Sequence, residues 1–119
     1  MMEERLIISK LIGSNLAVSS EKASIVFEKI QSNIASNIYT TVDFTGIKSL
    51  TTAFLNIAIG ELYRFKDKDT LNKLISIDVT TLSKLQFEKV KLVMENSREK
   101  YNSTLKKKID EVTLHGQVD

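Results

Sequence analysis

The sequence predicts an α/β fold: a small, partly parallel sheet covered by helices, with a long C-terminal helix. Two observations predict it. Short segments rich in β-branched and aromatic residues alternate with segments whose apolar residues recur at helical spacing. Strands joined through helices are typically parallel, because a parallel connection needs a long crossover. The 119 residues correspond to one domain with a modest core.

The first strand is expected at residues 5–12, because Leu6, Ile7 and Ile8 form an apolar centre there. Gly13, Ser14 and Asn15 have the composition of a turn. Residues 16–18 are then expected to form a short second strand that pairs with the first as a hairpin.

The first helix is expected to begin after Ser19 or Ser20, because either hydroxyl can accept a hydrogen bond from an N–H of the first turn. One apolar stripe follows at helical spacing and predicts the face that packs on the sheet. Its members are Ala23, Val26, Phe27, Ile30 and Ile34.

A central strand is expected at residues 38–44, and Thr45 and Gly46 follow it as a turn signal. A second helix is expected from about Thr52, with Thr51 or Thr52 as its N-cap. The loop between them joins the carboxyl end of a strand to the amino end of a helix. In α/β folds, ligands and partners usually bind at such a corner.

The second helix is apolar over most of its circumference, and both Phe54 and Leu62 are expected to be buried. A helix that packs on one sheet face needs only an apolar stripe. The excess is explained either by burial under the last helix or by contact with another chain, as in a homodimer.

The rest of the chain is expected to form a helical turn at residues 70–73, a strand at 74–79 and a long helix at 82–109. Asp78, Thr80 and Thr81 are candidate caps of that helix. The domain is expected to span residues 1–112, and residues 113–119 a loose tail, with a short strand through Val112 and Leu114 as an alternative. The expected core stripe of the long helix is Leu82, Leu85, Val90, Val93, Met94, Ser97, Tyr101 and Leu105.

A motif in the central stretch points to a family. The segment Val42-Asp43-Phe44-Thr45-Gly46-Ile47, followed by Thr52-Ala53-Phe54-Leu55, resembles the STAS-like domains, a bacterial family of unknown function related to anti-sigma-factor antagonists. The resemblance begins at Ile12 and extends to about Leu92. It implies the α/β fold expected above and a regulatory role through protein binding, with a histidine-kinase-like ATPase as the partner.

In anti-sigma-factor antagonists, a serine at the start of this helix is phosphorylated by the kinase partner. The matching residues here are Leu50-Thr51-Thr52-Ala53, so the modified position falls on Thr52 or on Ala53. If it is Thr52, that residue is the candidate phosphorylation site. If it is Ala53, the chain lacks the switch, and we expect a constitutive binding module.

Composition argues against several other function classes. The net charge of +2 does not favour nucleic acid, and without cysteine there are no thiolate metal sites. His115 is the only histidine, and Asp43 has no second carboxylate near it in sequence, so we expect no enzyme, metal or cofactor. Asp43 is expected to point away from the core or to cap the Gly46 loop. The acidic start is not typical of a signal peptide, and no stretch approaches membrane-spanning length, so a cytoplasmic location is expected.

We therefore predict a non-enzymatic module that binds a protein partner through the loop after the central strand and the first turns of the next helix. The predicted contact residues are Lys48, Ser49, Thr51, Thr52 and Asn56. The alternative is a homo-oligomeric scaffold protein that assembles through its second and third helices.

Overall fold

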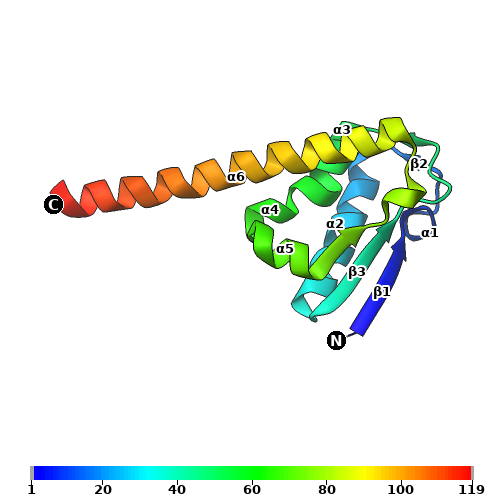
Figure 1. Ribbon diagram of the computed structural model, residues 1–119, viewed down its shortest axis with the longest axis horizontal. Coiled ribbons are helices and arrows are strands. Elements are labelled where there is room, and N and C mark those ends of the chain that lie inside the picture. The colour runs from blue at the N-terminus through cyan, green and yellow to red at the C-terminus, as the bar shows by residue number, and fades with distance from the viewer. Residues whose placement is uncertain (1, 119) are drawn as a thin grey trace.

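The computed structural model describes the backbone of residues 2–118 and the side chains of residues 2–101. Its main sheet has three parallel strands in the order β1 (Met2–Ile7), β3 (Ile38–Asp43) and β5 (Ile75–Ile77). A second, small sheet pairs β2 (Leu16–Ala17) with β4 (Ser49–Leu50), also in parallel. Figure 1 shows the sheet with its helices and the long C-terminal helix. The predicted α/β class is confirmed.

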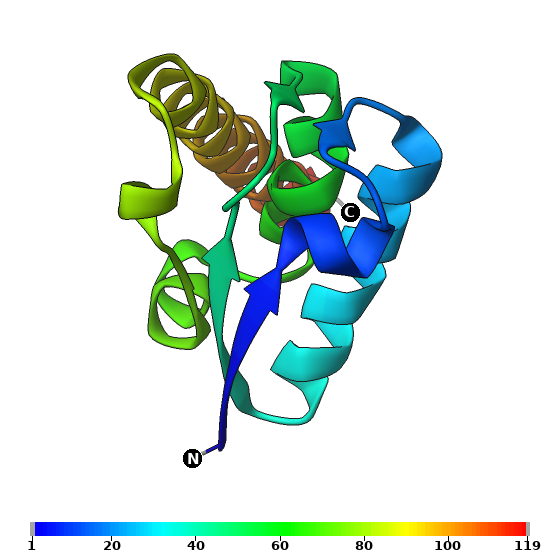
Figure 2. The same cartoon turned by 90° about the vertical axis from the view of Figure 1, so that its right-hand side faces the viewer.

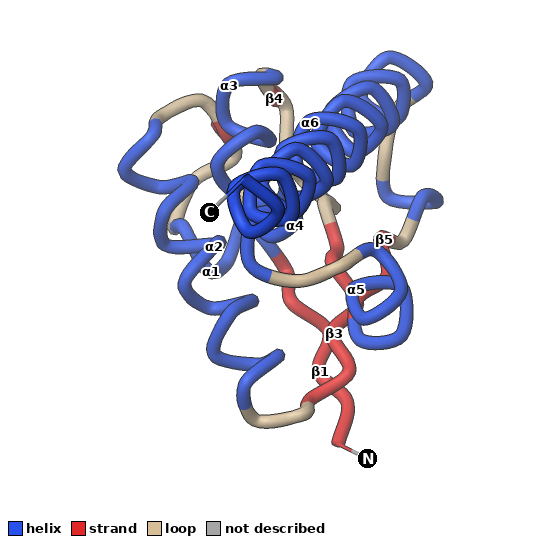
Figure 3. The backbone as a smooth tube through the Cα atoms, turned by 90° about the vertical axis from the view of Figure 1, so that its left-hand side faces the viewer, coloured by secondary structure: helices blue, strands red, loops and turns tan. Residues whose placement is uncertain are grey.

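The helical elements are α1 (Ile8–Ile12), α2 (Ser20–Ala35), α3 (Thr52–Leu55), the π-helix η1 (Asn56–Gly60), α4 (Leu62–Phe65), α5 (Lys68–Leu74), the 3₁₀-helix η2 (Val79–Thr81) and α6 (Lys84–Val118). α2 lies alongside β1 and β3, and α5 lies on the far side of β3 from it (Figures 2 and 3). α6 crosses the top of the molecule, and its C-terminal half projects beyond the other elements (Figure 1).

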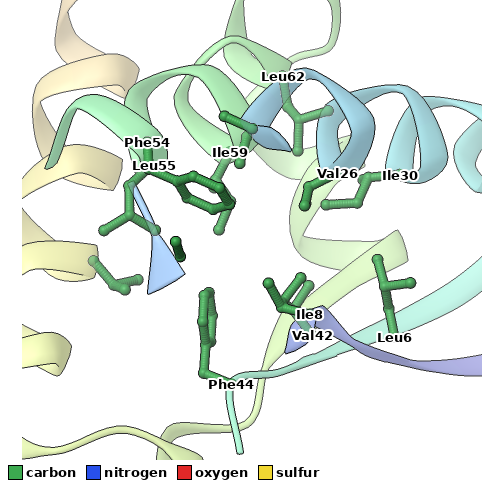
Figure 4. Close-up of a cluster of buried hydrophobic side chains, with 14 of the residues drawn as sticks. Leu6, Ile8, Val26, Ile30, Val42, Phe44, Phe54, Leu55, Ile59 and Leu62 are labelled. Atoms are coloured by element: carbon green, nitrogen blue, oxygen red, sulfur yellow. The ribbon is translucent and has the colours of Figure 1, made fainter. Parts of the chain in front are cut away.

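The register of the main sheet separates the face that packs on the hydrophobic core from the opposite face. β1 pairs with β3 from Met2 opposite Ile38 to Ile7 opposite Asp43, so Leu6 is paired with Val42. Both are buried in the core, together with Ile8 and Phe44 (Figure 4). Because successive side chains of a strand point to opposite faces, Arg5 and Asp43 belong to the other face.

The continuous segment formed by α3, η1 and α4 lies between α2 and α6 and is buried on several sides. Phe54 and Leu62 are both buried, as predicted (Figure 4). A Cβ atom placed on Gly60 would lie 2.7 Å from the Oγ of Ser97, so α6 packs directly on the backbone of this segment. Burial under the last helix therefore accounts for much of its apolar circumference. Phe65, at the end of α4, is 56% exposed.

The prediction for the first strand was wrong after Ile7, where the chain turns into α1. Spaced four residues apart, Ile8 and Ile12 both reach the core from one side of a single helical turn. Gly13 ends α1 with a φ of 65°, and its N–H donates to the carbonyl of Ser9. The predicted hairpin was also wrong, because α1 redirects the chain and β2 pairs with β4.

The first helix largely follows the prediction. The side chain of Ser19 accepts a hydrogen bond from the N–H of Lys22 and is the N-cap of α2. In the predicted stripe, Phe27 is partly buried and the other residues are buried.

The long helix differs from the prediction at both ends. α6 begins at Lys84 because Ser83 and Gln86 form a capping box, in which each side chain accepts a hydrogen bond from the other's backbone N–H. Leu85 is 64% exposed, so its place in the core stripe was wrong, whereas Val90, Val93 and Ser97 are buried.

Beyond residue 109, the backbone of α6 stays helical to Val118, so the predicted tail conformation and the alternative strand through Val112 and Leu114 were wrong. Residues 110–118 contain no proline, the residue that most strongly interrupts a helix. The side chain of Leu105 and residue 119 lie outside the described part of the chain. The domain boundary at residue 112 stays a prediction.

Candidate functional site

The loop after β3 is held in one conformation by its own backbone. Gly46 has a φ of 83°, in the left-handed region that glycine tolerates best. The N–H of Ile47 donates to the carbonyl of Phe44, which closes the turn, and Ile47 is itself buried. The N–H of Lys48 then donates to the carbonyl of Asn15 at 2.8 Å, where the chain enters the small β2–β4 sheet.

α6 supports the same loop from the other side. The Nε2 of Gln86 donates to the carbonyl of Ile47 at 3.1 Å, and the Nζ of Lys89 donates to the carbonyl of Leu50 at 3.0 Å. These bonds pair loop carbonyls with side chains of the same protein. The loop is therefore pre-organised, so a partner that binds it would pay little ordering entropy.

The five predicted contact residues divide into two groups. Lys48, Ser49, Thr52 and Asn56 are exposed along one continuous stretch. Thr51 is partly buried, and its Oγ1 accepts a hydrogen bond from the N–H of Phe54 at 3.1 Å, so it is the N-cap of α3. One of the two predicted caps is thereby confirmed, and Thr52 is left with an exposed side chain at the helix start.

Sequence reasoning did not include two apolar neighbours of this surface. Leu16 is paired with Ser49 in the β2–β4 sheet, and both side chains are exposed, whereas the next pair, Ala17 and Leu50, is buried. Val18, directly after β2, is also exposed. We call Leu16, Val18, Lys48, Ser49, Thr52 and Asn56 the loop surface. Leu16 and Val18 were not predicted as part of this surface because only the parallel pairing of β2 with β4 places them beside Ser49.

Asn56, the last member of the loop surface, begins the π-helix η1. The N–H of Glu61 donates to the carbonyl of Asn56 at 2.9 Å, the five-residue spacing of a π-helix. π segments inside helices frequently mark functional sites. Here the segment also brings Gly60 against α6.

A second cluster lies at the carboxyl ends of the main strands, on the face opposite the core. The Nη1 of Arg5 in β1 lies 2.9 Å from Oδ2 of Asp43 in β3 and 3.0 Å from Oδ2 of Asp78 after β5. The other oxygen of Asp43 accepts the N–H of Thr45 at 2.8 Å, as its predicted role in capping the loop requires. The other oxygen of Asp78 accepts from the N–H of Thr80.

These contacts shift the ionisation of the cluster. Burial raises the pKa of Asp43, but the hydrogen bonds from Thr45 and the Arg5 guanidinium outweigh it, and the pKa lies below its ordinary value. The hydrogen bond from Thr80 and the pairing with Arg5 lower the pKa of Asp78. The same carboxylates raise the pKa of Arg5. Each acid is thus held as a carboxylate and is engaged in the fold, which does not suit a general acid or base at neutral pH.

Within the part of the chain that the structure describes, no group of three histidine, cysteine, aspartate or glutamate residues is arranged to hold a metal ion. The described helices also include none that combines the length and the apolar composition needed to cross a membrane. The side chain of His115 lies outside the described residues.

Comparison with known proteins gives one match. The model of a family described as a STAS-like domain of unknown function matches residues 22–83, more than half of the chain. The match contains most of α2, the central strand β3, the helical segment after it and four members of the loop surface, Lys48, Ser49, Thr52 and Asn56. The other two members, Leu16 and Val18, precede the matched residues. No curated protein and no solved structure matches the chain.

Proposed function

This chain belongs to the family of STAS-like domains of unknown function, and on that premise we propose that it is a non-enzymatic module that binds a protein partner. The binding site is the loop surface. From the resemblance of the central motif to anti-sigma-factor antagonists, the partner is a histidine-kinase-like ATPase of a bacterial regulatory system.

The observation that carries this proposal is the combination of internal pairing and outward side chains in the loop surface. The backbone groups of Lys48 and Thr51 donate to the carbonyls of Asn15 and Ala17, so they need no partner. The side chains of Lys48, Ser49 and Thr52 remain free to contact another molecule. Exposed Leu16 and Val18 add apolar area beside them, as interfaces between proteins require.

We expect constitutive binding and no phosphorylation switch if the position modified in anti-sigma-factor antagonists falls on Ala53. Thr51, which is the N-cap, is partly buried and has its hydroxyl engaged. Thr52 is exposed, and it is the candidate for modification if any residue here is modified. A phosphate on Thr52 would add negative charge to a surface whose one ionisable member is Lys48.

The test is titration calorimetry with a purified histidine-kinase-like ATPase from the same organism. Lys48→Glu reverses a charge on the loop surface and should weaken binding, mainly through slower association. Thr52→Glu should weaken binding too, while the fold tolerates a carboxylate at a helix start. Lys73→Glu is the matched control, because Lys73 is exposed on α5, outside the loop surface.

Thermal melts of all three variants complete the test. Each should stay within about 0.5 kcal/mol of the stability of the parent protein, as is usual for surface substitutions. If Lys48→Glu and Thr52→Glu bind as tightly as Lys73→Glu, the loop surface is not the binding site.

A homo-oligomeric scaffold is the second candidate, and exposed apolar residues on the second and third helical segments favour it. Phe65 at the end of α4 is exposed, and so are Leu85 and Leu92, seven residues apart on α6. Residues at that spacing lie on nearly the same side of a helix. Light scattering at micromolar concentration separates the two candidates, because a scaffold would exceed the 13.4 kDa mass of one chain.

A further inference from the structure

A cavity of about 390 Å³ lies between α6 and the free edge of the main sheet, lined by residues outside the loop surface. α6 contributes Phe87, Val90 and Met94 to its wall, and the edge strand β5 contributes Ile75 and Ile77. The volume falls in the range of small-molecule pockets, roughly 300–1,000 Å³. Phe87 is exposed at this wall, so an apolar occupant would remove its ring from water.

One cation in this wall is held in place by the protein. The Nε of Arg98 donates to the hydroxyl of Tyr63 at 3.3 Å, and its guanidinium carbon lies 5.8 Å from the centre of the Tyr63 ring. This is the only hydrogen bond that the Arg98 side chain makes within residues 2–101. A guanidinium carries five N–H donors in a planar fork that suits carboxylate geometry.

The charge of the wall favours an anion. Its ionised side chains are Lys91, Arg98 and the carboxylate of Glu95, which lies between them on α6. Two cations and one carboxylate leave one positive charge on a mostly apolar cavity. An occupant with an apolar body and a single negative charge would balance it.

The edge strand argues against an added peptide strand as the occupant. β5 is three residues long. The N–H of Ile75 already donates to the carbonyl of Leu71, and the N–H of Asp78 donates inward to Val42 in β3. Strand addition gains its affinity from a series of main-chain hydrogen bonds, and this edge leaves too few.

We propose that the cavity binds a small amphiphilic anion, with its apolar body against Phe87, Val90 and Met94 and its acidic group on the guanidinium of Arg98. The ligand class is that of medium-chain carboxylates. This site is separate from the loop surface and does not depend on a protein partner.

Two small-molecule probes with carbon chains of equal length test the proposal. They are sodium decanoate, used below its micelle concentration, and decan-1-ol as its neutral counterpart. Calorimetry on the full chain should show that decanoate binds about ten-fold more tightly than decan-1-ol, the size of one charged hydrogen bond. Arg98→Gln should abolish that preference. Lys84→Gln, which removes an exposed charge of the same helix outside the cavity, should keep it.

A second pair of variants tests the cavity itself. Asn72 lines it from α5, so Asn72→Trp should fill its mouth and weaken both probes at least about ten-fold. Lys73→Trp, at the next residue and outside the cavity, should leave both affinities unchanged. Circular-dichroism melts confirm that each variant is folded. Absence of decanoate binding to the parent protein, full binding to Asn72→Trp, or an undiminished preference in Arg98→Gln would overturn the proposal.

Discussion

Replacing Phe54 with alanine is the most direct test of how the helices pack. Phe54 is 1% exposed and reaches the core from α3, next to Leu55 and near Phe44 (Figure 4). Removal of a fully buried phenylalanine ring costs about 3–5 kcal/mol, because the lost burial is joined by the cost of the cavity left behind. The upper part of that range is expected, since α3 is held between α2 and α6 and cannot easily collapse into the space.

That loss is large compared with the stability of the whole domain. At about 0.05–0.15 kcal/mol per residue, a chain of this length has a free energy of unfolding of roughly 6–18 kcal/mol. Phe54→Ala should therefore shift the midpoint of urea unfolding strongly, as followed by far-ultraviolet circular dichroism.

Phe65→Ala is the matched control, since it deletes the same ring near the other end of the same helical segment. Phe65 is 56% exposed, and its ring centre lies 5.9 Å from that of Phe27. Loss of such an aromatic pair costs about 0.5–1.5 kcal/mol. A loss under 1 kcal/mol for Phe54→Ala, or one no greater than for Phe65→Ala, would refute the packing described for α3.

Gly60→Ala should destabilise the protein by about 1–3 kcal/mol in a denaturant melt, because the new Cβ lies 2.7 Å from the Oγ of Ser97. Adding Ser97→Ala should recover part of that loss, and no recovery would mean that the Oγ is not the obstacle. The lowered pKa values of Asp43 and Asp78 give a pH dependence: their contribution to stability is complete above the ordinary carboxyl pKa of about 3.9 and is lost as pH falls through the lowered values. Asp43→Asn should therefore flatten the acid side of the curve of melting temperature against pH, and an unaltered acid side would exclude Asp43 as a contributor. Light scattering of a single-chain binding module should give 13.4 kDa, whereas twice that mass would favour the scaffold.

The central part of the fold could be predicted because its signals are local. Residues 38–44 have strong β-propensity, Gly46 supplies the turn, and Thr51 has a hydroxyl at the position that an N-cap requires. The helical spacing of Phe54 and Leu62 was likewise sufficient to predict their burial. Each of these features is decided within a few residues of sequence.

The prediction of the first strand was wrong beyond Ile7 because the apolar run there is too short to show a strand or a helix period. Leu6, Ile7 and Ile8 form an apolar run that suits a strand or a buried helix equally well. The change occurs in the middle of that run, where Gly13 allows a single helical turn to end before β2. The π-helix had no sequence signal either. It places Gly60 against Ser97, and these residues are 37 positions apart in the numbering.

The loop surface was predicted in part, and the charged cluster was not. Lys48, Ser49, Thr52 and Asn56 follow one another closely in sequence, so a correct strand and helix were enough to place them together. Arg5 is separated from Asp43 by 38 positions and from Asp78 by 73. Only the parallel register, in which three strands end at one edge, brings these groups together.

This cluster also bears on where the protein binds. The carboxyl edge of a parallel sheet is the usual ligand site of α/β folds, but here Arg5 bonds both Asp43 and Asp78 at that edge. A ligand that needed these carboxylates would first have to displace Arg5 and leave the buried Asp43 without its charged partner, which costs free energy. The loop surface carries no such penalty, because its backbone is paired within the chain and its side chains face outward. The energetic comparison therefore favours binding beside the carboxyl edge, through the loop surface, over chemistry at the edge itself.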